Sequence, residues 1–243
     1  WLPDGDPGGA ELQLTADLRD GRMSSVWRYV PWPSAGDETL AWLRQSLRQG
    51  VVRQGAFLYQ GLLVDRPGSP PSLMQMHFDV DSGELAYAPG WPALRNLSAG
   101  IDINNHRLEV TAHQTQVYES VARDVRADIP DLEHPVLHVL GDIDSTGSDV
   151  ARLFRETPLK ERAGRMLDLV SVKGEVTGKL DMTMPLADSG QTTVSVDAEL
   201  PGNPVVLNEA RQVDLWLSGR LHYDSAHGLS SPPMQAYFLS QPV

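Results

Sequence analysis

The sequence contains no cysteine, no long apolar run, and too few basic residues to balance its acidic ones. The absence of cysteine excludes disulfides, thiolate catalysis and Cys-based zinc sites. No stretch approaches the roughly 18 apolar residues of a membrane-spanning helix. Lys and Arg number 20 against 32 Asp and Glu, and the resulting formal net charge of -12 repels phosphate backbones. We therefore expect neither a nucleic-acid partner nor a bilayer-crossing helix in this sequence.

The sequence motifs of common enzyme and metal sites are also missing. No GxSxG, HExxH, P-loop or GxGxxG pattern occurs. The segment from Asp142 to Gly147 resembles the start of a calcium loop, but the twelfth position is Leu153 instead of the required Glu. His134 and His138 have helical metal-ligand spacing, yet Pro135 indicates an extended chain that would separate their rings. We therefore predict a protein that is not an enzyme, with no catalytic residues, no metal site and no cofactor.

The chain starts with Trp1-Leu2-Pro3, without an initiator Met or a basic and apolar leader. We therefore expect a single segment, residues 1–243, excised from a longer protein. A weak internal repeat is also visible, because Leu97–Ile103 matches Leu217–Tyr223 at a constant offset of 120 positions. The match suggests possible sub-repeats of about 1–130 and 131–243.

Apolar residues at every second position are the dominant pattern, and this period is typical of half-buried β-strands. In Leu97–Ile103, for example, Leu, Ala, Ile and Ile alternate with Ser, Gly and Asp. The sequence Asp81-Ser82-Gly83 has turn chemistry and predicts a hairpin between Met74–Val80 and a returning strand through Tyr87. Similar alternation elsewhere predicts about a dozen strands, including 12–18, 108–112, 125–129, 137–143, 172–186, 194–200, 213–223 and 234–238.

Helices are predicted at only a few places. The run Asp37–Gln49 places leucines on one face, with Gly50 as its C-terminal stop. A second helix is expected to start at Ser148 as N-cap and to end before Pro158. A third, short helix is expected over 161–167.

These few helices cannot cover the apolar face of a dozen strands, so something else must. One solution is a sandwich or closed barrel whose inner faces pack on each other. The other is a curled sheet whose concave face stays lined with Leu, Ile, Val and Met and is filled by lipid chains. An acyl chain of about 16 carbons would recover on the order of 10 kcal/mol there, at about 0.8 kcal/mol per CH₂. The pattern alone leaves both solutions open.

Several short motifs resemble the periplasmic part of the AsmA-like family, in particular its YhdP-type members, which are relatives of TamB. They follow the order of that family from about residue 29 to the end. The motifs are Tyr29-Val30-Pro31 with Thr39–Leu43 and Gly50; Tyr87–Leu94; Ala127–Asp131; Thr157-Pro158-Leu159; Gly178-Lys179-Leu180 with Pro185-Leu186; and Gly228–Met234.

This resemblance implies a mainly β fold: a long, strongly curved antiparallel sheet that forms an open apolar groove, with two or three short helices. It also implies a non-catalytic segment of a lipid-transport bridge that moves glycerophospholipids between the inner and outer membranes of a Gram-negative envelope. The segment would lie in the periplasm, with an inner-membrane anchor helix outside it. Its expected partners are phospholipid acyl chains, neighbouring groove segments of the same full-length chain and other envelope proteins.

The family provides no catalytic residues to transfer, so the candidate site is the groove lining taken from the strand pattern. The expected lining residues are Met74, Met76, Phe78, Leu85, Tyr87, Leu97, Ile101, Ile103, Leu108, Val110, Leu137, Val139, Ile143, Val176, Leu180, Met182, Leu217, Leu221 and Tyr223. Two alternatives stay open. The chain could be an envelope assembly scaffold that binds protein partners through strand edges, or a hydrolase that uses the Asp-rich turns near Asp79 and Asp142.

Overall fold

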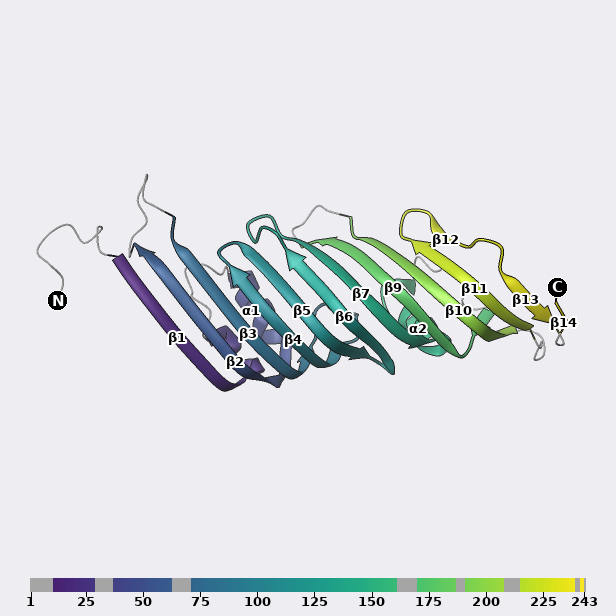
Figure 1. Cartoon of the computed structure of the whole chain (residues 1–243), viewed down its shortest axis with the longest axis horizontal. Coiled ribbons are helices and arrows are strands. Elements are labelled where there is room, and N and C mark those ends of the chain that lie inside the picture. The colour runs from purple at the N-terminus through teal and green to yellow at the C-terminus, as the bar shows by residue number, and fades with distance from the viewer. Residues whose placement is uncertain are drawn as a thin grey trace, which may run out of the picture.

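The computed structural model describes residues 11–28, 37–62, 71–160, 170–186, 191–207, 215–238 and 241–242. These residues form one antiparallel sheet of 14 strands with a few short helices (Figure 1). The predicted fold class, a long β-sheet that stays open, is therefore confirmed. None of the described helices has the length and apolar character needed to cross a membrane.

The strands follow each other in space almost as they do in sequence. The sheet order is β1-β2-β3-β4-β5-β6-β7-β9-β10-β11-β13-β14, while β8 and β12 add to the sides of β10 and β11. The strands are β1 (Glu11–Arg22), β2 (Leu47–Leu62), β3 (Leu73–Leu85), β4 (Leu94–Asn104), β5 (Arg107–Val117), β6 (Ser120–Ile129), β7 (Val136–Thr146), β8 (Val170–Val172), β9 (Glu175–Pro185), β10 (Thr193–Leu207), β11 (Leu215–Asp224), β12 (Gly228–Ser230), β13 (Gln235–Phe238) and β14 (Gln241–Pro242).

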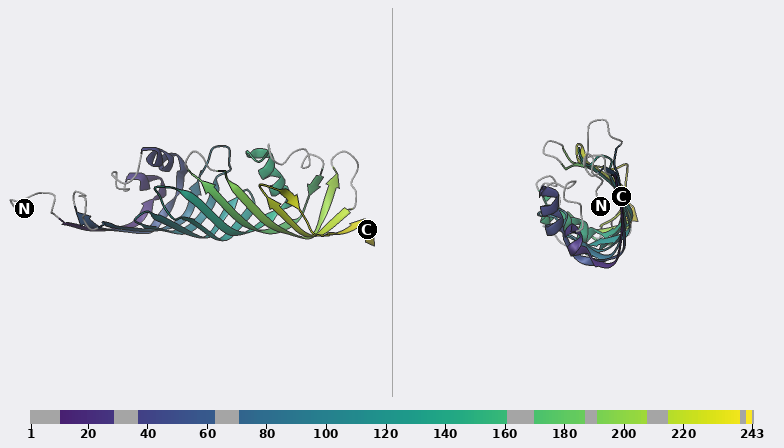
Figure 2. Two further views of the ribbon diagram at one scale, coloured as in Figure 1. Left: turned by 90° about the horizontal axis from the view of Figure 1, so that it is seen from above. Right: turned by 90° about the vertical axis from the view of Figure 1, so that its left-hand side faces the viewer.

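The sheet bends across its width into a trough, and its strands stack along the long axis of the molecule (Figure 2). Antiparallel neighbours lie about 4.8 Å apart, so the eleven steps from β1 to β14 extend over about 50 Å. The strand ends define two long rims. The helical rim is where β1, β3, β5, β7 and β10 end, and the turn rim is where β2, β4, β6, β9 and β11 end.

Three short helical segments lie on the helical rim, on the open side of the sheet (Figure 2). The 3-10 helix η2 (Met23–Arg28) and helix α1 (Asp37–Ser46) connect β1 to β2, and helix α2 (Gly147–Glu156) follows β7. Met23 packs on Val52 and Val80 to form one small core at this rim. A second small core lies next to it, made of Leu97, Ala99 and Ala112. Among the described residues, these two clusters thus cover only a part of the apolar face.

Both predicted helices exist, but their ends differ from the prediction. Helix α1 stops at Ser46, and the residues expected as its last turn begin β2. Gly50 is therefore no helix stop: it lies within β2 at φ +125°, where an added Cβ would be 2.8 Å from the Cα of Gly83. The N-cap of α2 is Thr146, not Ser148, because the Thr146 hydroxyl accepts the N–H of Asp149 at 3.1 Å. The helix expected over 161–167 lies outside the described residues.

The predicted hairpin at Asp81-Ser82-Gly83 is wrong. Strand β3 continues through these residues to Leu85, and its pairing with β4 shifts register between Val80 and Gly83. Ser82 adopts a positive φ of 53°, so the turn-forming residues make a β-bulge that keeps the strand in the sheet. Similar register shifts between β2 and β3 break the period of two in β2, which explains why the sequence did not indicate that strand.

The offset of 120 positions between Leu97–Ile103 and Leu217–Tyr223 corresponds to equivalent strands. It carries β3 onto β10 and β4 onto β11, each at nearly the same bounds. At the same offset, the register shift between Val80 and Gly83 in the β3–β4 pair falls close to the shift between Pro201 and Asn203 in the β10–β11 pair.

Candidate functional site

One face of the sheet carries an apolar stripe that crosses strand after strand. Residues directly paired in an antiparallel ladder place their side chains on the same face, so the register shows which side chains line up. One row runs from β2 to β6 through Phe57, Met76, Ile103, Leu108 and Ile129. A second row, in the other half of the sheet, runs from β6 to β10 through Ala127, Val139, Met182 and Val194.

The stripe continues to the C-terminal end of the molecule. Leu180 pairs with Val196, which pairs with Tyr223, and the next row brings Ala198 beside Leu221. Near the last strands, Leu215 pairs with Phe238. The apolar side chains of the described strands therefore share one face of the sheet. The stripe that they form continues from the first half of the sheet into the second.

Within the described part of the chain, no second sheet packs on this stripe, because each strand makes its main contacts with its sheet neighbours. Helices α1, α2 and η2 cover only part of it. Most stripe residues are half-buried by their neighbours and open on one side, and Leu14 of β1 is 47% exposed. A sandwich or sealed barrel would bury them almost fully. The described residues therefore form an open apolar trough.

The predicted lining residues occupy this stripe with one exception. Met76 and Leu97 are buried in it, and the others in strands are half-buried along it. Tyr87 lies outside the strands, in the connection from β3 to β4, where its ring centroid is 6.2 Å from that of Trp91. Burial there raises the pKa of Tyr87 to about 12, with Tyr118 adding to the effect. Tyr87 is therefore part of the helical rim rather than of the trough floor.

Several stripe residues escaped the sequence prediction. Phe57 and Tyr59 belong to the undetected strand β2, and Phe154 comes from α2, whose side chains reach over the sheet. Alternation within β10, which places Val194 and Val196 on the stripe, was visible in the sequence and could have identified those residues.

The opposite face of the sheet is polar, and several of its charged side chains are paired. His77 Nδ1 lies 2.7 Å from Asp102 Oδ1, and Arg220 Nε lies 3.1 Å from Glu199 Oε1. The hydrogen bond to Asp102 is the main reason that the pKa of His77 is raised, with Asp79 contributing further. This face looks into water along its length, which fits a trough that presents only its inner side to a ligand.

A shallow hollow of about 640 Å³ lies over β7, β9, β10 and β11. Charged side chains of the polar face line it, including Asp142, Lys179 and Glu199. Asp142 pairs with Lys179 at 3.8 Å and Asp144 pairs with Arg123. The two aspartates of the calcium-like motif are therefore strand residues already matched with cations. The lining of the hollow also includes Ile143, Ala198 and Leu221 of the apolar stripe.

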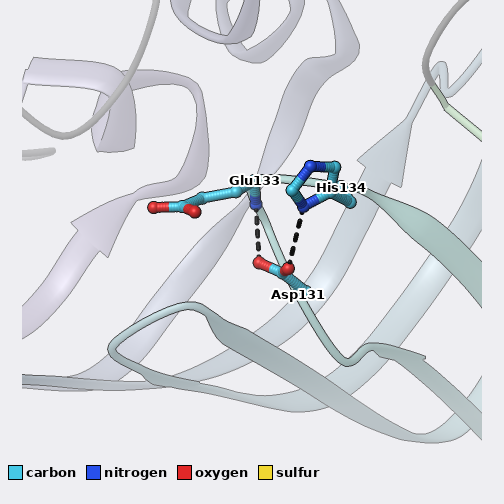
Figure 3. Close-up of side chains that lie close together, drawn as sticks. All are labelled: Asp131, Glu133 and His134. Atoms are coloured by element: carbon cyan, nitrogen blue, oxygen red, sulfur yellow. Dashed lines mark hydrogen bonds and ion pairs between the residues drawn. The ribbon is translucent and has the colours of Figure 1, made fainter.

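One group of possible metal ligands occurs among the described residues, at Asp131, Glu133 and His134 (Figure 3). The Asp131 carboxylate accepts the backbone N–H of Glu133 at 2.9 Å and lies 3.1 Å from Nδ1 of His134. These contacts, led by the Glu133 N–H, lower the pKa of Asp131. The arrangement closes the turn between β6 and β7 in solvent, and the side chains of Glu133 and His134 are well exposed. His138 lies on the next strand, beside Thr183 at 3.3 Å, apart from this turn.

Helix α2 is fastened to the helical rim by polar contacts. The buried carboxylate of Asp149 accepts hydrogen bonds from the N–H of Glu119 at 2.9 Å and the hydroxyl of Ser120 at 2.8 Å. Tyr118 donates to Glu156 at 2.9 Å, and its ring lies 4.0 Å from the guanidinium of Arg152. Arg152 and Tyr118 together lower the pKa of the Glu156 carboxyl.

The comparisons with known proteins agree with this geometry. A family model described as YhdP protein matches residues 3–243. Over 240 residues, the chain is 26% identical to the "Intermembrane phospholipid transporter YhdP" of Escherichia coli (strain K12). The match covers 96% of this chain but 18% of that protein, so the chain spans less than a fifth of its relative's length. No solved structure matches. With the family model covering nearly the whole chain, we conclude that this protein belongs to the YhdP family.

Proposed function

We propose that the chain is a non-catalytic segment of a groove that conducts phospholipids. The observation that carries this proposal is the apolar stripe, which runs unbroken across the strands and is left open by the described residues. The name of the Escherichia coli relative, a phospholipid transporter acting between membranes, supports the same ligand.

The groove would bind lipids only through the transfer of their acyl chains from water to the apolar stripe. Acyl chains lie against the stripe and leave water, which stabilises them by about 0.8 kcal/mol per buried CH₂, while headgroups stay at the mouth. A continuous apolar wall makes neighbouring positions similar in energy, so a chain can slide without a chemical step. The nineteen predicted lining residues would supply this wall, with Tyr87 at its rim.

The ends of the sheet support the proposal that this segment lies within a longer groove. Among the described residues, β1 pairs with β2 alone, which leaves the N–H and C=O groups of its other edge for a further strand. We propose that neighbouring segments of the full-length chain continue the sheet there and beyond β14. The repeated positions of β3–β4 and β10–β11 fit sub-repeats of about 1–130 and 131–243. In the full-length protein, we propose that the segment lies in the periplasm, with an inner-membrane anchor elsewhere.

Mass spectrometry of lipids extracted from the purified chain tests the proposal. Ile101→Asp places a carboxylate on the stripe, and Thr111→Asp places one on the polar face beside it. We expect phospholipid to co-purify with the wild type and with Thr111→Asp, and to be lost at least about tenfold from Ile101→Asp because an ionised carboxylate is costly in an apolar site. Equal lipid in both variants, or none in the wild type, would contradict the groove.

The alternative is a scaffold that binds envelope proteins through strand edges. It predicts that binding depends on the edge of the sheet and is unaffected by substitutions on the stripe. A protein partner bound at the β1 edge would be retained by Ile101→Asp and lost when proline removes edge N–H groups.

A further inference from the structure

Helix α2 lies on the helical rim, and one of its side chains contacts a residue of the turn rim. It begins directly after Thr146, the last residue of β7 at the helical rim. Near its other end, the ring of Phe154 meets the ring of Tyr223 edge to face, with centroids 6.1 Å apart. Tyr223 is the last residue but one of β11, beside the turn at residues 225–227 on the turn rim. The pair of Phe154 and Tyr223 therefore bridges the open side of the sheet, where the helices lie (Figure 2).

Helix α2 directs different side chains at the helical rim and at the trough. Its best-buried side chains are Asp149 and Ala151, which dock on the helical rim. Its large apolar side chains, Val150, Leu153 and Phe154, share one face at i, i+3 and i+4, and all three are only half-buried. Because Phe154 touches Tyr223 of the stripe, this apolar face is turned toward the trough.

The contacts at the two rims differ in kind. At the helical rim, Asp149 accepts two hydrogen bonds, and the N–H of Gly147 donates to the carbonyl of Gly174 at 2.9 Å. Tyr118 of the same rim holds the last turn of α2 through Glu156 and Arg152. There is no room at Gly147 for a side chain, since an added Cβ would lie 2.2 Å from the carbonyl oxygen of Val172. At the turn rim the contact is the aromatic pair of Phe154 and Tyr223. Such a pair is weak enough to separate thermally.

We propose that α2 is a strap across the mouth of the groove, hinged at the helical rim and latched to the turn rim by Phe154 and Tyr223. This inference rests on the proposed function and adds a step to it. Acyl chains can pass under the strap along the stripe, with its apolar face as a roof. A headgroup that travels in water at the mouth meets the strap, so the latch must open for each lipid to pass. Phe154 and Tyr223 thus control passage past this point.

The opening of the strap can be measured without lipid. The chain has no native cysteine, so spin labels can be placed at Lys160→Cys, just beyond α2, and at Leu229→Cys, the exposed strand neighbour of Tyr223. We expect a short-distance population that falls by about two- to tenfold, relative to the open one, in Phe154→Ala, the effect expected for one aromatic pair. An unchanged distance distribution in Phe154→Ala would overturn the latch.

The effect on lipid movement is tested by locking the strap. In Phe154→Cys/Tyr223→Cys, a short reducible bis-methanethiosulfonate reagent links the two positions, and transfer of phosphatidylethanolamine with a fluorescent acyl chain between vesicles is followed. We expect linking to slow transfer at least about tenfold and reduction to restore it. The control, Asp181→Cys/Ser195→Cys, links paired residues on the polar face and should leave transfer unchanged.

The possible failures are distinguishable. If the linked chain transfers lipid as fast as the reduced one, the strap is not an obstacle and the inference is overturned. If the wild type binds no fluorescent lipid at all, the proposed function fails, and the label distances still decide whether the strap opens.

Discussion

Replacing each of two valines in the sheet by alanine tests whether the apolar stripe is open or sealed. Val52 is fully buried, with 0% of its surface exposed, against Met23 and Val80. Truncation to Ala removes two methyl groups, which costs about 1.6 kcal/mol of transfer free energy and about 2–3 kcal/mol when the remaining cavity is included. Val139 sits on the stripe between Ala127 and Met182 and is only half-buried.

For Val139→Ala we expect a loss of about 1 kcal/mol or less, because its outer side already faces the open trough and no cavity is formed. Urea denaturation gives the free energy of unfolding of both variants, compared at equal m-values. Thr111→Ala on the polar face is the control and should stay within about 0.5 kcal/mol of the wild type. If Val139→Ala costs as much as Val52→Ala, another layer covers the stripe, and the argument for a groove fails.

Two further predictions concern single polar groups. Asp149→Ala removes the acceptor of the Glu119 N–H and leaves the Ser120 hydroxyl with Ser145 as its partner. We expect a loss of about 1–3 kcal/mol in the free energy of unfolding and faster amide exchange in α2, measured by hydrogen exchange. Unchanged exchange would contradict the hinge. The pKa of His77 is raised, chiefly by its hydrogen bond to Asp102 and also by Asp79. Its stabilising effect is therefore fully present below the unfolded pKa and lost as pH rises through the higher folded pKa. An NMR titration should show the raised pKa and its return toward the ordinary value in Asp102→Asn; an unshifted pKa in the wild type would refute the pairing.

The sequence predicted the strands wherever their alternation is regular. Leu97–Ile103 is the clearest case, since each apolar residue of that run lies on the stripe. Strand β2 was missed because its register shifts break the alternation, and its first residues resemble the end of an amphipathic helix. The hairpin at Ser82 was wrongly predicted for a similar reason, because a register shift there forms a β-bulge. A bulge and a turn use the same residues, and only pairing with distant strands decides between them.

The open or closed state of the sheet could not be predicted from alternation. A half-buried strand has the same pattern in a sandwich and in a trough, because each has one apolar face. The role of Phe154 was also hidden. Its helix was predicted from the local sequence, but its contact with Tyr223 joins residues that are 69 positions apart and depends on the curvature of the whole sheet.

The order of the strands has a consequence for length. Each strand pairs with its sheet neighbours and makes its main contacts with them, so stability in such an array is close to a sum of nearest-neighbour terms. Inserting or deleting a pair of antiparallel strands would change the span by about 10 Å while leaving distant parts intact. A chain of this architecture can thus be matched to the distance it has to cover by duplication of existing strands, without redesign of a shared core.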